Sequence, residues 1–117
     1  MIDKIVVKVL EIDEEVTPFE DWYYSLKDSK TRQLILARLA RLRAGNLGDW
    51  KSVGSGVFEL RIDFGPGYRV YFGRSGKTII VLLGGGDKKS QSRDIEFAIS
   101  LWERYKDAVE RFERDFS

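Results

Sequence analysis

The alternation of apolar and polar residues near the N-terminus predicts a strand followed by a short helix. Residues 3–10, "DKIVVKVL", are apolar on both faces of an extended chain. The segment "TPFE" that follows predicts a helix start, with Thr17 as N-cap, Pro18 at the first helical position and Glu20 closing a capping box. The apolar side chains of this helix recur at helical spacing, which favours packing in the core over an exposed stacking platform.

A second helix is predicted in "KTRQLILARLARLRAG", with either Asp28 or Ser29 as its cap. Its leucine and isoleucine residues repeat at one-turn spacing, and arginines occupy much of the remaining surface. Gly45 and Asn46 end the helix because both tolerate left-handed geometry. The two helices form a hairpin. Its arginines fit either a solvated face or a basic wall beside the sheet.

After a predicted loop at 46–56, the pattern indicates three strands, at 57–64, 68–74 and 77–84. The connections "GPG" and "SG" are short, so neighbouring strands should be antiparallel hairpins. A long amphipathic helix then runs from about Gln91 toward Asp115. The order β-α-α-β-β-β-α predicts one α+β domain spanning residues 1–117, with a helical hairpin and a C-terminal helix around a mostly antiparallel four-stranded sheet.

The first hairpin should carry one apolar face and one charged face. With Gly65, Pro66 and Gly67 as a three-residue loop, one face is apolar, while the other pairs Asp63 with Arg69 and Arg61 with Tyr71. The two-residue "SG" turn would set Leu82 beside Arg69, so that the arginine face becomes a partly covered groove. The alternative is a solvated face with weak cross-strand ion pairs. One shared core is predicted, containing Leu60, Ile62, Val70, Phe72, Val81 and Trp102.

Composition narrows the possible chemistry. The 117 residues contain no cysteine and no histidine. This excludes a disulfide framework, a thiolate nucleophile or metal site, and the commonest general base and metal ligand; no metal or other cofactor is expected. The longest apolar run, Ile79 to Leu83, is too short to cross a bilayer, and the first residues lack signal-peptide features. We therefore expect a cytoplasmic protein.

Charge is distributed unevenly although the net charge is only +1. Residues 1–28 carry a net charge of −5, residues 29–93 of +9, and residues 94–117 of −3. A basic middle segment predicts a surface for a polyanion. The alternative is that the acidic ends cancel the basic segment within the fold.

Three sequence segments together resemble one toxin family. "ELRIDFGPGYRVYF", "IIVLLGGGDKKSQSRDI" and the preceding pair of helices resemble the RelE/ParE superfamily, specifically its HigB-like, phage-type addiction module killer toxins. "GGGDKKSQS" also resembles a glycine-rich phosphate loop at a helix N-terminus. The family resemblance covers nearly the whole chain. It implies a RelE-like fold and a ribosome-dependent endoribonuclease that cuts mRNA and is inhibited by a cognate antitoxin. Arginines and lysines could stabilise the charge of the reaction without a metal.

The resemblance also implies site residues. Arg69 matches the arginine thought to hold the scissile phosphate, Arg61 matches a basic residue on the neighbouring strand, and Lys88 and Lys89 match a basic cluster after the last strand. The predicted catalytic residues are Arg61, Arg69, Tyr71 and Lys88. The predicted RNA-binding residues are Arg38, Arg41, Lys88, Lys89 and Arg93.

Without histidine, the general acid and base stay open. Cleavage through a 2′-hydroxyl requires that hydroxyl to lose a proton, the phosphorane to be stabilised and the leaving oxygen to gain a proton. The candidates are a lysine of lowered pKa, Tyr71, Glu59, Asp63 or ribosomal RNA. Two other functions also stay open: a ParE-like toxin that binds DNA gyrase, and a non-catalytic module that binds its antitoxin or RNA. The oligomeric state of the free chain is not predicted.

Overall fold

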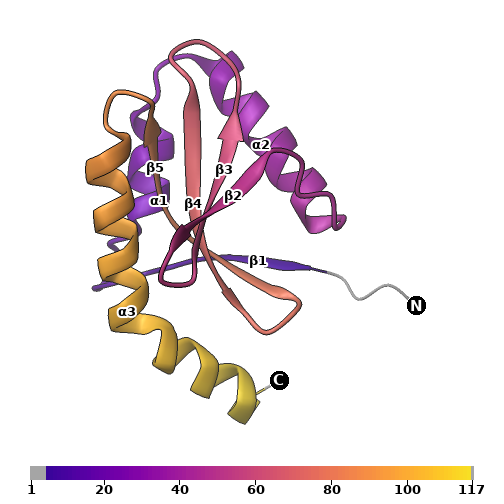
Figure 1. Cartoon of the computed structure of the whole chain (residues 1–117), viewed down its shortest axis with the longest axis vertical. Helices are drawn as coiled ribbons and strands as arrows, with labels where there is room; N and C mark the ends of the chain where they lie inside the picture. The colour runs from indigo at the N-terminus through magenta and orange to yellow at the C-terminus, as the bar shows by residue number, and fades with distance from the viewer. Residues whose placement is uncertain (1–4, 117) are drawn as a thin grey trace.

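The computed structural model describes residues 5–116, which form three helices and a five-stranded mixed sheet (Figure 1). In chain order the elements are β1 (Val6–Val9), α1 (Pro18–Ser25), α2 (Ser29–Arg43), β2 (Trp50–Gly54), β3 (Val57–Ile62), β4 (Tyr68–Ser75), β5 (Ile79–Asp87) and α3 (Gln91–Phe116). The α+β class is thus confirmed. The first two residues of the strand predicted at 3–10 lie outside the described range.

The sheet has the strand order β1-β5-β4-β3-β2. β1 runs parallel to β5, and the other pairs are antiparallel. The prediction of four strands was wrong, because 46–56 contains β2 rather than only a loop. β2 pairs with β3 through an irregular hairpin, in which Gly54 and Gly56 adopt positive φ. These glycines and Ser55 read as a loop in the sequence, although they are the turn of a hairpin.

The helices begin close to the predicted positions. Pro18 occupies the first turn of α1 and Thr17 is extended, but the Thr17 side chain makes no capping hydrogen bond. For α2 the structure selects Asp28 as N-cap, since its carboxylate accepts a hydrogen bond from the backbone N–H of Lys30 at 3.0 Å. The same carboxylate accepts one from the Thr31 hydroxyl at 3.1 Å.

Helices cover both faces of the sheet and create two cores rather than the single predicted one (Figure 1). α1 and α2 pack on one face, and α3 packs on the other. The predicted core residues are divided between these layers. Leu60, Ile62, Val70 and Phe72 lie under α1 and α2, whereas Val81 and Trp102 belong to the layer beneath α3. The apolar residues on both sides of β5 are therefore explained by burial on two faces.

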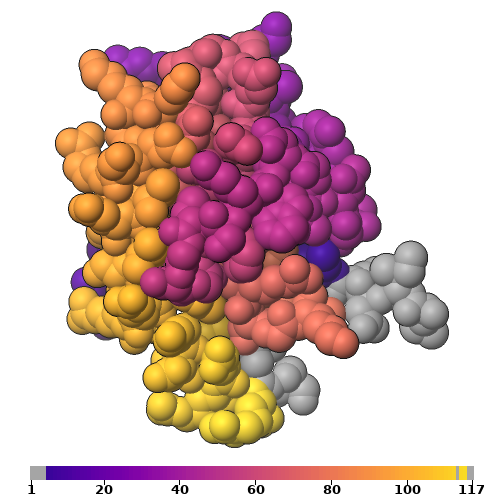
Figure 2. Space-filling model, viewed as in Figure 1, coloured from indigo at the N-terminus to yellow at the C-terminus, as the bar shows by residue number. Residues whose placement is uncertain are grey.

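Two glycines in the central strands leave space for tryptophan rings from the helices, because they have no Cβ atom. A Cβ atom on Gly85 would lie 2.2 Å from the Trp22 ring of α1, and one on Gly73 would lie 2.4 Å from the Trp102 ring of α3. Figure 2 shows the segment around β2 and its turn lying across the front of the molecule beside α3.

The glycines of "GGGDKKSQS" are strand residues of β5, so the predicted phosphate loop was wrong.

Candidate functional site

Arg61 and Arg69 lie directly opposite each other on β3 and β4, on the same face of the sheet. The hairpin loop is longer than the predicted three residues, and the pairing is displaced by two positions along the strand. Because side chains alternate with a period of two, this displacement preserves the predicted faces and changes only the partners. Arg69 is therefore not paired across the hairpin with Asp63. On its other side Arg69 pairs with Gly86 rather than Leu82. The predicted two-residue "SG" turn was wrong, because Ser75 pairs with Ile79 and the turn is longer, and the ladder is shifted once more between Tyr71 and Phe72.

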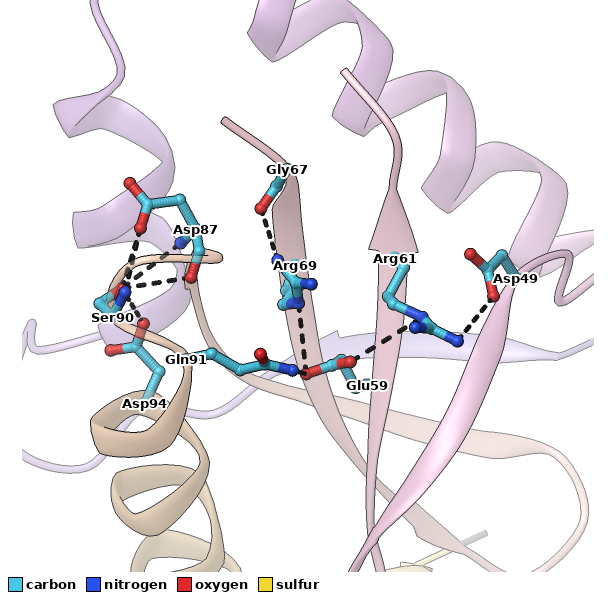
Figure 3. Close-up of polar contacts among 9 residues, drawn as sticks. All are labelled: Asp49, Glu59, Arg61, Gly67, Arg69, Asp87, Ser90, Gln91 and Asp94. Atoms are coloured by element: carbon cyan, nitrogen blue, oxygen red, sulfur yellow. Dashed lines mark hydrogen bonds and ion pairs between the residues drawn. The ribbon is translucent and has the colours of Figure 1, made fainter. Parts of the chain in front are cut away.

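A buried carboxylate, that of Glu59, lies between the two arginines (Figure 3). Its side chain is 0% exposed. Glu59 Oε2 lies 3.5 Å from Arg69 Nε, and Oε1 lies 4.0 Å from Arg61 Nε. Gln91 Nε2, from the first residue of α3, donates a hydrogen bond to the same Oε2 at 2.8 Å. One carboxylate thus contacts side chains from β3, β4 and α3.

The guanidinium groups are held at a second point as well. Arg69 Nη1 donates to the carbonyl of Gly67 at 2.8 Å, and Arg61 Nη2 lies 3.3 Å from Asp49 Oδ1. Within residues 5–116, Arg69 Nη2 takes part in no hydrogen bond or ion pair. Arg69 keeps 11% of its side chain exposed and Arg61 keeps 38%. Each arginine is thus oriented while part of its donor fork faces solvent.

These arginines line a continuous basic groove made of two adjoining depressions of about 390 and 250 Å³. The larger lies against α2, and the smaller lies over β4 and the β5–α3 connection. Asp49, Arg61, Ile62 and Asp63 border both. The basic residues along the groove are Arg38, Arg41, Arg61, Arg69 and Lys88. Two exposed carboxylates, Asp49 and Asp63, balance only part of this charge.

Arg38 links α2 to the sheet at one end of the groove. Its side chain is buried, and its Nη2 donates to the backbone carbonyls of Asp49 at 3.4 Å and Arg61 at 3.5 Å. Burial lowers the pKa of Arg38, and the nearby positive charge of Arg41 lowers it further. Gly48 leaves room for the guanidinium, since a Cβ there would lie 2.4 Å from Arg38 Nη1.

Three predicted site residues lie apart from the groove lining. Tyr71 is fully buried in the layer beneath α3, and no hydrogen bond within the described residues reaches its hydroxyl. Burial, and after it the neighbouring Glu59 carboxylate, raises the pKa of Tyr71, so the phenol holds its proton more tightly than an exposed tyrosine does. Lys89 and Arg93 are exposed at the start of α3 but border neither depression.

Two site residues were missed from the sequence. Asp49 was assigned to a loop, and Gln91 was noted only as the start of the last helix. The polar turn "GDW" before a strand and a glutamine at a helix start are both ordinary surface features. Of the residues that contact the two arginines, Glu59 could be found from the sequence, because it stands two residues before Arg61 and so lies on the same strand face.

The part of the chain that the structure describes contains no group of three or more His, Cys, Asp or Glu side chains suited to holding a metal ion. None of its helices has the length and apolar character required to cross a membrane.

The chain is related in sequence to a bacterial protein. No family model matches it. An uncharacterized protein of Haemophilus influenzae is 49% identical over 80 residues, covering 68% of this chain and 81% of that protein. The chain therefore belongs to the same family as the Haemophilus protein.

Proposed function

We propose that this chain is a RelE/ParE-type, HigB-like toxin with a RelE-like fold, acting in the cytoplasm as a ribosome-dependent mRNA endoribonuclease. The observation that carries the proposal is the basic groove, in which Arg69 and Arg61 are side by side with oriented guanidinium groups. The resemblance of the "ELR" and "GYRVYF" strands to this superfamily supports the same function.

The groove is suited to stabilising negative charge at a phosphate. Arg69 Nε faces Glu59 and Nη1 is bonded to Gly67, which leaves Nη2 available to a phosphate oxygen. Arg61 stands on the neighbouring strand and Lys88 follows β5, so three cations surround one end of the groove. Charge that develops on a pentacoordinate phosphorane would be stabilised there without a metal.

Proton transfer would come from residues at the surface of the groove or from the ribosome. Glu59 and Tyr71 are fully buried, and a group that exchanges a proton with substrate must contact it. Asp63 and Lys88 are exposed and border the groove. This scarcity of exposed acid–base groups fits an enzyme whose site is completed by ribosomal RNA.

We further propose that a cognate antitoxin, encoded beside this gene, binds over the groove or the adjoining helices. The basic lining favours an acidic segment in that partner. Coexpression with the neighbouring reading frames should give a complex and restore growth.

The test of the nuclease is cleavage of mRNA on purified ribosomes by the wild-type chain and its Arg69 variants. Arg69→Ala should lower the cleavage rate by roughly 10²–10³ if the arginine stabilises transition-state charge. Arg69→Lys should retain part of the activity, because lysine keeps the charge and loses the planar donor fork.

Lys77→Ala is the matched control, since Lys77 is exposed in the β4–β5 turn and borders neither depression. Its cleavage rate should equal that of the wild type. Full activity in folded Arg69→Ala would remove this groove from the mechanism. DNA breaks without mRNA cuts on induction would instead support the gyrase-binding toxin, and neither lesion would support a non-catalytic module.

A further inference from the structure

The buried carboxylate of Glu59 lies beneath two arginines that face each other across β3 and β4. Like charges opposite one another on antiparallel strands repel. Glu59 is two residues before Arg61, on the same strand face, and it pairs with Tyr71, the residue two positions after Arg69. The carboxylate therefore reaches both Nε atoms from below the groove, at 3.5 and 4.0 Å.

We propose that Glu59 is a positioning residue, which acts through Arg69 and Arg61 to hold their guanidinium groups toward an anion in the groove. This inference rests on the proposed function for its catalytic consequence, but the positioning itself is a property of the folded chain. In the same arrangement Gln91 orients Glu59, because its amide donates to the oxygen that faces Arg69.

In each arginine, some guanidinium nitrogens contact protein groups and others are left for a ligand. Glu59 occupies the Nε side of Arg69, Gly67 occupies Nη1, and Nη2 keeps its donors for a ligand. The Nε side of Arg61 also faces Glu59, while its Nη2 lies near Asp49 at the groove surface. A guanidinium held in this way binds an oxyanion with less loss of rotational freedom.

Stability alone gives a weaker account of a carboxylate at this position. An ion pair that is removed from water gains little over well-packed apolar side chains, because desolvation offsets the attraction. Glu59 is 0% exposed, and it pairs across the strands with Tyr71 of the apolar layer beneath α3. A negative charge at this point has its main effect on the two arginines above it.

The first measurement is solvent exchange of the arginine Nε–H protons by NMR in the full chain. In the wild type, the Arg69 Nε–H should exchange about tenfold more slowly than that of exposed Arg41, because Arg69 Nε is buried and lies in an ion pair with Glu59. Glu59→Gln should abolish most of this difference. Affinity for inorganic pyrophosphate, used as a simple anion probe, should fall about tenfold in the same variant.

A second variant tests the inference without a change at the buried position 59. Gln91→Leu removes only the donor to Glu59, at a half-buried position in the first turn of α3. It should raise Arg69 Nε–H exchange and weaken pyrophosphate binding by a few-fold. The melting temperature should fall by roughly 4–12 °C with the native fold retained, because the buried carboxylate loses one donor. Glu103→Gln, the same chemical change at an exposed position of α3, should alter neither quantity.

The outcomes separate this inference from the proposed function. Faster Arg69 exchange, weaker pyrophosphate binding and at least tenfold slower cleavage in folded Glu59→Gln would support it. If wild type cuts no mRNA while exchange and pyrophosphate binding still respond, the nuclease proposal fails and the positioning role stands. Unchanged exchange and binding in both variants would overturn the inference, as would wild-type cleavage by Glu59→Gln. If Glu59→Gln does not fold, Gln91→Leu decides alone.

Discussion

Replacing Arg69 should destabilise the fold as well as the site. An arginine that lies off the apolar face is expected from sequence to be dispensable for folding. In the structure, however, its removal leaves the fully buried Glu59 carboxylate with only Gln91 and a 4.0 Å contact to Arg61. We therefore predict coupling between positions 59 and 69, measured by a cycle of Arg69→Met, Glu59→Gln and the double variant.

The magnitude follows from the burial of the pair. Arg69→Met keeps most of the aliphatic stem but leaves the buried Glu59 carboxylate without its main ionic partner. This loss costs about 3 kcal/mol of unfolding free energy. Glu59→Gln loses the ionic component while an amide oxygen still accepts from Gln91, so its cost should be about 2 kcal/mol. The double variant contains no unpaired buried carboxylate. Its loss of unfolding free energy should therefore be smaller than the sum of the two single losses by about 1–3 kcal/mol.

The assay is urea denaturation of the four proteins at pH 7, with thermal melting as a second probe. For a chain of this size, each kcal/mol shifts the melting temperature by about 4 °C. Arg69→Met should therefore melt about 12 °C below the wild type. Energies that add to within about 0.5 kcal/mol would mean that the two side chains do not interact, and would refute the reasoning.

Three further predictions concern the surrounding structure. Gly85→Ala should cost about 1–3 kcal/mol, since its methyl group would meet the Trp22 ring at 2.2 Å, whereas Gly84→Ala, with nothing within 4 Å, should melt near wild type. Val70→Asp should not fold, because it buries an unpaired charge, and circular dichroism will show whether the native spectrum is lost. The raised pKa of Tyr71 means that the folded wild type holds the phenol proton more tightly than the unfolded chain does. The stability that this proton contributes should be complete below pH ~10 and should fall as the pH rises further. Urea midpoints measured between pH 8 and 11 should show less of this loss in Tyr71→Phe.

Local signals in the sequence were sufficient for the helices and for the order of strands in the central hairpins, although not for the hairpin registers. Pro18 and Asp28 mark the starts of α1 and α2 because their effects act within one turn of chain. Apolar alternation placed Arg61 and Arg69 on one face, since a period of two fixes the face even when the register is displaced by two residues. The class α+β and the basic middle segment also followed from the sequence.

Contacts between distant segments required the tertiary structure. β2 was not recognised because glycine, serine and a turn occupy the same stretch, and its pairing with β3 supplies the missing support. The glycines of β5 read as a loop because the ring that fills the space above Gly85, that of Trp22, comes from α1. The division into two cores likewise depends on which helix covers which face.

The site shows the same division between local pattern and tertiary contact. The sequence identified the two arginines, and it assigned Asp63 as the partner of Arg69 from an assumed three-residue loop. The folded chain instead brings Glu59 beneath both arginines and Gln91 onto Glu59 across 32 positions of sequence. Strand alternation determines which side chains share a face, but hairpin length and helix docking determine which of them touch, because both depend on packing that no local pattern encodes.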